Sequence, residues 1–167
     1  MKSLTLITLN LLTASVALAD GPRASAESRL TVSAAVAIRA KLQLGVSGVS
    51  FADTDASTTP VINANENGSI TVTSWVRTPR GTRPLLTVKA ADDLKSGQDA
   101  IAISNVSFTA SGASEYQAGA LSKDEQTVAT FQRSGRYDGS YNFKLQNSAD
   151  YVPGNYSTQV VYTLVVP

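Results

Sequence analysis

The fold class of this chain is decided by residues 70–77, which read ITVTSWVR. In an extended chain, successive side chains point to opposite faces, so Ile70, Val72 and Val76 share one face. Isoleucine, valine and threonine are also the residues that strands favour. The same alternation recurs further along, in Tyr141, Phe143 and Leu145. These stretches predict strands with one buried face.

Similar stretches occur along most of the chain and are separated by clusters of Gly, Asn, Asp, Ser and Pro, and no helical period is sustained. We expect strands at Leu30–Ile38, Lys41–Phe51, Ser69–Arg77, Leu85–Ala90, Ile101–Phe108, Gln126–Phe131, Gly139–Leu145 and Tyr156–Val166. We expect turns at Asn63–Gly68, Thr78–Pro84, Asp92–Gln98, Ser134–Gly139 and Asn147–Asn155. Only Ala113–Gln126 is compatible with a short helix. About eight short strands in a chain of this size predict an all-β sandwich or barrel.

The composition excludes many kinds of chemistry. The chain has 167 residues, no cysteine, no histidine and a formal charge of +1. Without histidine there is no Ser-His-Asp or Cys-His triad and no histidine-bound zinc. Without cysteine there is no disulfide, thiolate nucleophile or iron–sulfur cluster. A charge near zero argues against nucleic acid as a partner. We expect no enzyme and no cofactor.

The first residues have the features of an export signal. Lys2 precedes an apolar run, Leu4–Leu18, and Ala17-Leu18-Ala19 is a small-x-small cleavage site before Asp20. We expect residues 1–19 to be a signal peptide and the protein to be exported and soluble. A buried strand or helix is the alternative interpretation of this run.

A long alternating run follows the predicted signal. Every even-numbered residue from 30 to 46 is apolar, and the extended run would cover roughly 50 Å at about 3.3 Å per residue. Sandwich strands are usually about 17–20 Å long. The run therefore bends near Arg39-Ala40-Lys41, or its first half belongs elsewhere. The apolar side chains of that first half are Leu30, Val32, Ala34, Val36 and Ile38.

The predicted strand Tyr156–Val166 is the last of the chain, which ends at Pro167. Its second half is apolar on both faces, because Val161 and Val165 alternate with other apolar residues, as in a strand at the centre of a sheet. A central strand needs a neighbour on each side, and an unpaired edge invites pairing with another chain. The residues that we expect to line the vacancy beside it are Tyr156, Val160, Tyr162, Leu164 and Val166.

A spare N-terminal strand and a vacancy beside the last strand suggest donor-strand complementation, in which the first strand of one subunit fills the groove of its neighbour. The alternative is that Leu30–Ile38 folds back and completes its own sandwich. The pattern alone leaves both open.

Several segments resemble the alpha class of chaperone–usher pilins, the type of the colonisation factor antigens and of cable pili. The opening Leu30–Val36 and the ending Gly154–Ser157 with Val160–Val166 resemble the ends of these pilins. The segments Thr71–Thr78, Leu86–Asp92 and Ala100–Ser104 resemble their middle strands. One departure is the polar stretch Asp20–Arg29 ahead of the donor-like strand, which leaves the donor register open.

The resemblance implies an immunoglobulin-like β-sandwich that lacks its last strand and receives a donor strand from a neighbouring subunit. It implies residues 20–38 as the donor extension and residues 39–167 as one pilin domain. It also implies a major shaft subunit that polymerises with itself into a surface fimbria for attachment. A periplasmic chaperone, an outer-membrane usher and a tip adhesin would be its partners.

Other candidate sites have plainer interpretations. Arg77, Arg80 and Arg83 bracket a Pro/Gly loop and could bind an acidic glycan or a neighbouring subunit, although a solvated hairpin tip is the simpler interpretation. Trp75 is out of phase with its apolar neighbours. It is either a surface platform for a sugar ring, or a core residue placed by a bulge or a subunit contact, which we favour. Tyr156 is expected to form a tyrosine corner.

Three sets of residues have a less specific chemical signal. Asn63–Gly68 resembles the start of a calcium loop but has Ser74 where a bidentate acid is needed, so a turn is favoured, and Asp53 with Asp55 is read as solvated. A glycosidase would need two carboxylates, for which the candidates are Asp92, Asp93, Glu115, Asp124 and Glu125. The main alternative function is a self-contained secreted module that binds a glycan or a surface protein.

Overall fold

The computed structural model describes residues 28–65 and 69–167. The chain divides into two compact units, Met1–Ala35 and Val36–Pro167, which we treat separately. In the first, the described residues 28–35 are exposed and form no strand. The predicted signal peptide lies outside the described residues.

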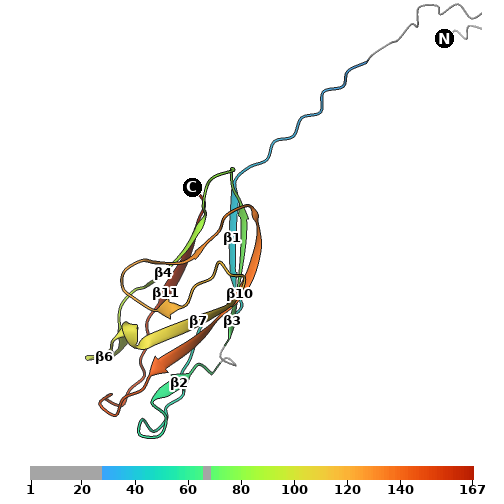
Figure 1. Ribbon diagram of the computed structural model, residues 1–167. Coiled ribbons are helices and arrows are strands. Elements are labelled where there is room, and N and C mark those ends of the chain that lie inside the picture. The colour runs from blue at the N-terminus through green and yellow to red at the C-terminus, as the bar shows by residue number, and fades with distance from the viewer. Residues whose placement is uncertain (1–27, 66–68) are drawn as a thin grey trace, which may run out of the picture. The chain divides into compact units, whose positions relative to one another are not determined.

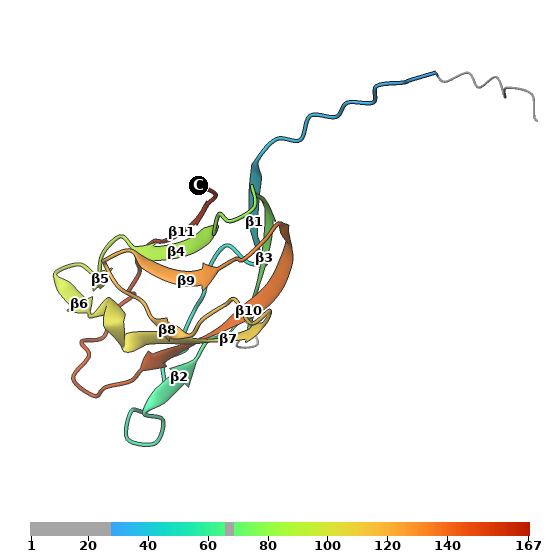
Figure 2. The ribbon, with the colours of Figure 1, turned by 45° about the horizontal axis from the view of Figure 1, so that its top comes forward.

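The second unit is built almost entirely of strands (Figures 1 and 2). Its elements are β1 (Arg39–Leu44), β2 (Val61–Asn63), β3 (Ile70–Arg77), β4 (Leu85–Ala90), β5 (Leu94–Ser96), β6 (Asp99–Ile101), the 3-10 turn η1 (Ile103–Asn105), β7 (Val106–Gly112), β8 (Gly119–Ala120), β9 (Gln126–Thr130), β10 (Gly135–Gln146) and β11 (Val160–Val165).

The strands form two antiparallel sheets and a small hairpin. One sheet has the order β1-β3-β10-β7-β8, with β2 paired to the end of β10, and the other has the order β11-β4-β9. β5 and β6 pair with each other. Figure 2 shows the β11-β4-β9 layer over the β10-β7 layer. The all-β sandwich predicted from the sequence is therefore confirmed.

The core lies between these layers and contains the apolar faces that the alternation predicts. In β3, Ile70, Val72 and Val76 are buried, while Arg77 is exposed. The most completely buried side chains include Val72, Leu86, Val88, Phe131 and Tyr141. The rings of Phe108 and Tyr141 meet edge to face with centroids 5.1 Å apart. Such pairs stabilise a core beyond their buried area.

One polar pair lies inside this core. The Ser74 side chain points inward from β3 and is fully buried. The Tyr116 hydroxyl lies 3.1 Å from Ser74 Oγ and donates a hydrogen bond to the Tyr137 carbonyl at 3.0 Å. Burial is the largest cause of the raised pKa of Tyr116. Both buried hydroxyls therefore have a partner, as buried polar groups need.

The boundaries of several predicted elements were wrong. Lys41–Phe51 is not one strand: β1 ends at Leu44, and residues 45–51 form no strand. Ile101–Phe108 is interrupted by η1, because the Ile103 N–H bonds the Asp93 carboxylate at 2.9 Å. In the predicted turn Ser134–Gly139, all residues from Gly135 onward belong to β10. Ala113–Gln126 contains β8 and no helix.

The segment Leu30–Ile38 is not a strand in this structure either: residues 28–38 are exposed and without regular secondary structure. The last strand begins at Val160 rather than at Tyr156. The tyrosine corner is present, since the Tyr156 hydroxyl donates to the Val152 carbonyl at 2.7 Å. Between this corner and β11, Ser157 pairs with Lys95 of β5 through backbone hydrogen bonds of 3.0 and 3.1 Å.

Candidate functional site

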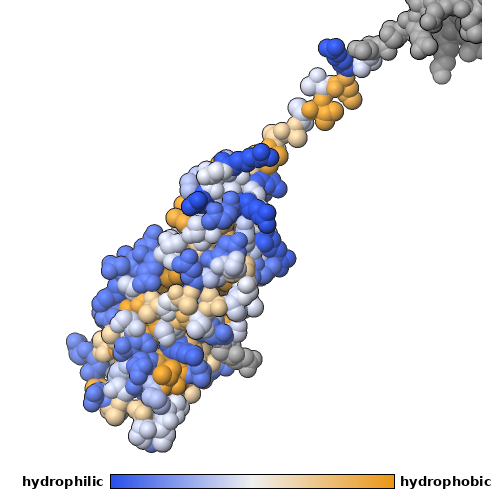
Figure 3. Space-filling view, viewed as in Figure 1, coloured by the Kyte–Doolittle hydropathy of each residue, from blue (hydrophilic) through white to orange (hydrophobic). Residues whose placement is uncertain are grey.

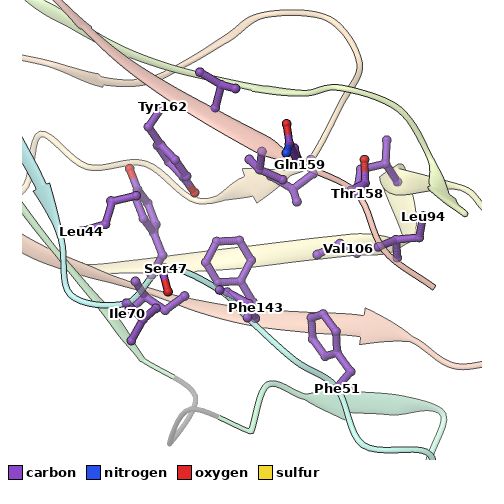
Figure 4. Close-up of a pocket in the computed structure, with 18 residues that line it drawn as sticks. Leu44, Ser47, Phe51, Ile70, Leu94, Val106, Phe143, Thr158, Gln159 and Tyr162 are labelled. Carbon is purple, nitrogen blue, oxygen red and sulfur yellow. The ribbon is translucent and has the colours of Figure 1, made fainter. Parts of the chain in front are cut away.

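The candidate site is a groove between the end of β1, the segment that follows it, and β11. Its volume is about 350 Å³, and most of its lining is apolar. Figure 4 shows Tyr162 from β11 and Phe143 from β10 pointing toward the same space, with Leu44 and Phe51 beside it. The groove therefore opens the core between the two sheets.

β11 is the strand that borders this groove, and it is paired on one side. It is antiparallel to β4 along its whole length, from Val160 opposite Ala90 to Val165 opposite Leu85. Among the described residues no strand pairs with its other edge. Unpaired N–H and C=O groups along a strand edge are a template for pairing with another chain.

The side chains of β11 are apolar on both faces but incompletely covered. Val160, Tyr162 and Leu164 point inward and are half-buried, and Val166 beyond the strand is also half-buried. On the outer face, Val161 is 57% exposed and Val165 is 44% exposed. The sequence predicted side chains suited to the centre of a sheet and a vacancy beside this strand; among the described residues, β11 is an edge strand.

The Tyr162 hydroxyl is buried and has no hydrogen-bond partner among the described residues. Its ring stacks on that of Tyr141 with centroids 6.1 Å apart, and both residues line the groove. Burial raises the pKa of Tyr162, and burial is also the main cause of the raised pKa of Tyr141. The Tyr141 hydroxyl has an acceptor, the Val128 carbonyl at 3.2 Å. The Tyr162 hydroxyl is thus a hydrogen-bond donor in the groove that has no acceptor among the described residues.

The predicted donor segment exposes its apolar side chains. Leu30 is 88% exposed, Val32 84%, Val36 72% and Ile38 54%, and Ala34 between them is also exposed. Hydrophobic side chains stand out along the segment ahead of β1 in Figure 3. Single exposed apolar residues are ordinary, but a regular row of them marks an interaction surface.

Trp75 and the neighbouring cations form a second exposed feature. The register of β3 continues through Trp75 without a bulge, so its side chain lies on the outer face and is half-buried. Lys41 Nζ lies 4.7 Å and the Arg136 guanidinium carbon 5.2 Å from the ring centroid. The interpretation of Trp75 as a core residue is therefore wrong, because Ser74 takes the inward position. Arg77, Arg80 and Arg83 are exposed at the end of the same sheet.

Three of the carboxylates considered for other chemistry are held in local interactions. Asp93 accepts hydrogen bonds from the Ile103 N–H and the Lys123 ammonium, and both lower its pKa. The pKa of Asp92 is lowered by Lys95 and by the Asp93 N–H. A general acid needs a raised pKa instead. Asp55 caps a turn through Ser57. The calcium-like stretch Asn63–Gly68 lies partly outside the described residues.

Within the described ranges, no group of three or more acidic side chains suited to a metal ion occurs. The same ranges contain no helix with the length and apolarity that a membrane span requires. Comparisons with protein-family models and with curated proteins found no match for this chain.

Proposed function

We propose that this chain is a structural subunit of a surface fimbria and polymerises by donor-strand exchange for cell attachment. The sequence resemblance to alpha-class chaperone–usher pilins suggests the class of subunit. The geometry of the groove beside β11 supports donor-strand exchange as the mechanism. The observation that carries the proposal is the free edge of β11 beside an apolar groove, in a chain that also exposes an alternating apolar segment.

The length of β11 and the length of the predicted donor segment are compatible. β11 has six residues, which correspond to about 20 Å at about 3.3 Å per residue. The segment Leu30–Ile38 would extend over roughly 30 Å, enough to pair with all of β11 and to reach beyond it. Alternation is also what a donor strand needs, because one of its faces must fill the groove.

The expected energy of one junction is large for a domain of this size. Each apolar side chain of Leu, Val or Ile that passes from water into the groove contributes about 1–3 kcal/mol. Four such side chains are exposed in the segment, so burial amounts to on the order of 10 kcal/mol, comparable with the stability of a whole domain. Neighbouring copies would therefore stabilise one another in a chain that has no disulfide.

Tyr162 fits the same proposal. Its hydroxyl lines the groove without an acceptor. A strand added beside β11 brings a row of backbone carbonyls into the groove, and one of them can accept this hydrogen bond. Supplying an acceptor to a buried hydroxyl that lacks one is favourable, so this hydrogen bond would add to the binding free energy of an incoming strand.

The proposal includes a route to the surface. Residues 1–19 would direct export, the chain would pass through the periplasm, and the fimbria would be extracellular. An exposed edge and an open core are liable to aggregate. A periplasmic chaperone that lends a strand, and an outer-membrane usher, would protect and order the subunits until a neighbour supplies the donor.

The test is polymer formation by the full chain, exported from a bacterium and run on SDS gels without boiling. Donor-strand polymers are kinetically locked, and we expect a ladder of bands that collapses on boiling. Deletion of residues 20–38 should remove the ladder. A copy of Leu30–Ile38 placed after Pro167 on a flexible linker should restore a folded monomer.

Two single substitutions provide a matched comparison within the donor segment. Val32→Asp places a charge on the face that enters the groove and should abolish the ladder, because a buried unpaired charge is strongly unfavourable. Ser33→Asp places the same charge on the opposite face and should leave it. A deletion variant that still polymerises like the full chain contradicts the proposed function.

A second candidate function is a self-contained binding module for a glycan or a surface protein. The observation that favours it is the Trp75 ring between Lys41 and Arg136 on an exposed face. A module of this kind would run as one band on the unboiled gel, and Trp75→Ala would abolish its binding.

A further inference from the structure

The cations of the second unit are concentrated at the end of the sandwich where β1 begins, which we call the basic end. Arg39 at the start of β1 lies opposite Arg77 at the end of β3. A hydrogen bond from the Thr78 N–H to Ser134 Oγ joins the loop after β3 to the loop before β10. The exposed side chains of the basic end are Arg39, Lys41, Arg77, Arg80, Arg83, Arg133 and Arg136.

These charges are poorly neutralised within the chain. Among the described residues, the one ion pair of the basic end joins Arg136 to Asp138, at 2.9 Å. Arg39 and Arg77 are directly opposite on neighbouring strands, an arrangement of like charges that destabilises a sheet. The fold therefore tolerates repulsion here, as expected of a surface that meets an anionic partner.

The opposite end of the sandwich, which we call the acidic end, carries the complementary charge. Asn147 Nδ2 donates to the Thr54 carbonyl and Thr158 Oγ1 to the Asp92 carbonyl, so the loops after β1, β4 and β10 meet there. In Figure 1 this end is the lower one, with β2 and β6, while β1 begins at the upper end. The carboxylates of the acidic end include Asp53, Asp55, Asp92, Asp93, Asp99, Asp124 and Asp150.

Local lysines neutralise part of the acidic end. Lys95 pairs with Asp92, and Lys123 pairs with Asp93 at 2.7 Å. Asp53, Asp99 and Asp150 are exposed and have no ion pair with a described residue. The near-zero formal charge of the chain thus hides two ends of opposite sign.

We propose that the basic end of one copy docks on the acidic end of the next, so that electrostatic attraction guides each addition to the polymer. This inference rests on the proposed polymerisation and concerns the surface around the inserted strand. Complementary potentials chiefly raise the rate of encounter and fix orientation. A second copy of this chain is a partner that carries the matching charge.

The end contact is compatible with insertion of the strand in one direction. The donor segment joins its own domain at the basic end, where β1 begins. β11 runs from the acidic end, where Val160 is opposite Ala90, toward the basic end. A donor antiparallel to β11 leaves the groove at the acidic end and brings the incoming basic end there. A parallel donor would place two basic ends together, which like charges oppose.

The test measures how fast the wild-type full chain forms the unboiled SDS ladder at 0.05 M and at 1 M NaCl. Salt shortens the Debye length from more than 10 Å to about 3 Å, so we expect the rate to fall about tenfold or more. Arg80→Glu with Arg83→Glu, and separately Asp99→Lys with Asp150→Lys, should each slow assembly about tenfold at low salt. All four changes together should restore the wild-type rate to within about threefold.

The matched control is Lys89→Glu with Lys144→Glu, which changes the net charge as much as the paired arginine variant does. Lys89 and Lys144 are exposed on β4 and β10, near the ends of these strands that belong to the acidic end. We expect this control to assemble at the wild-type rate or faster, whereas a dependence on net charge alone would slow it as much as it slows the arginine variant. Circular dichroism melts establish that each variant is folded, and the salt series on the wild type does not depend on any variant.

Three results would overturn the inference. A wild-type ladder whose growth ignores both salt and charge reversal leaves donor-strand polymerisation standing and removes the docking of charged ends. Loss of retention on heparin by the arginine variant, with unchanged ladder growth, assigns the basic end to an acidic polysaccharide instead. Absence of any wild-type ladder at either salt concentration removes the proposed function and this inference together.

Discussion

β10 and β11 carry similar sequence patterns but lie in different surroundings. β10 pairs with β3 on one side and with β7 on the other, and Tyr141, Phe143 and Leu145 are buried. Among the residues that the structure describes, β11 pairs with β4 alone, and its inward side chains are half-buried. Alternation therefore specifies which face of a strand is apolar, whereas the number of neighbours decides how far that face is covered.

The comparison shows that a strand can have side chains suited to the centre of a sheet without having two neighbouring strands in its own described chain. β10 obtains its full complement of neighbours from its own chain. β11 has side chains suited to a sheet centre and obtains one neighbour. The predictions below test whether this difference in coverage is real, from the largest expected effect to the smallest.

The largest effect compares one leucine from each strand. Leu145→Ala in β10 removes a buried side chain and should lower the free energy of unfolding by about 2–5 kcal/mol. Leu164→Ala in β11 removes a half-buried one and should lower it by about 1–2 kcal/mol. Urea titration of the chain without residues 20–38 measures both. Equal losses would contradict the difference in coverage.

Alkaline pH should act on the tyrosines of both strands. Burial raises the pKa of Tyr141 and of Tyr162 above the usual 10, so the unfolded chain releases these protons first. Stability is then fully present below pH 10 and falls as pH rises beyond it, by up to about 1.4 kcal/mol per pH unit for each tyrosine. Between pH 5 and 9 we expect little change, since the chain has no histidine.

The measurement is a series of urea titrations from pH 5 to 11, with tyrosinate absorbance recorded in parallel. The part of the tyrosinate signal that is absent from Tyr141→Phe and Tyr162→Phe variants should appear together with unfolding. A midpoint that stays constant up to pH 11 would show that these two hydroxyls do not resist ionisation in the folded state.

Gly139→Ala should destabilise β10. A Cβ at Gly139 would lie 2.5 Å from Tyr116 Cδ2 and 2.9 Å from the Ser111 carbonyl oxygen, so the strand or the ring must shift. Overpacking of this kind costs about 1–3 kcal/mol. Gly135→Ala in the same strand is the control, because its nearest contact would be an ordinary 3.5 Å to Tyr137 Cε2. Thermal melts of the two variants should separate clearly.

The smallest effect concerns the groove. Tyr162→Phe removes a buried hydroxyl without a partner and should raise the stability of the monomeric chain by about 1 kcal/mol. In a polymer, where a neighbour would supply an acceptor, the same change should give no gain. An unchanged or lower stability of the monomer would indicate that the hydroxyl already has an acceptor there.

Much of the sandwich could be predicted from alternation. The strand Leu85–Ala90 coincides with β4, and Ser69–Arg77 and Gln126–Phe131 each differ from β3 and β9 by a terminal residue. Tyr156 could be assigned to a corner because its partner is local in sequence. Each of these inferences needs information from a short stretch of chain alone.

The misplaced elements depend on distant residues. The break at Ile103 is set by Asp93, and Gly135 and Gly139 enter β10 although the composition of that stretch indicates a turn. Strand position 139 is a glycine because the Tyr116 ring occupies the space that a side chain would fill. Alternation already places Trp75 on the outer face, and the inward position beside it can hold Ser74 because that hydroxyl has a buried partner in Tyr116. No local pattern contains the positions of Asp93 and Tyr116.

The pair of hydroxyls at Ser74 and Tyr116 has one further consequence for how β3 is aligned. Alternation of apolar residues is preserved if a strand slides by two positions, since the same face stays buried. Such a slide would bring Val72 or Val76 opposite the Tyr116 hydroxyl and leave that group without Ser74. The wrong alignment would thus lose a buried hydrogen-bond contact. A single serine in an otherwise apolar row therefore distinguishes the native alignment of β3 from its nearest competitors.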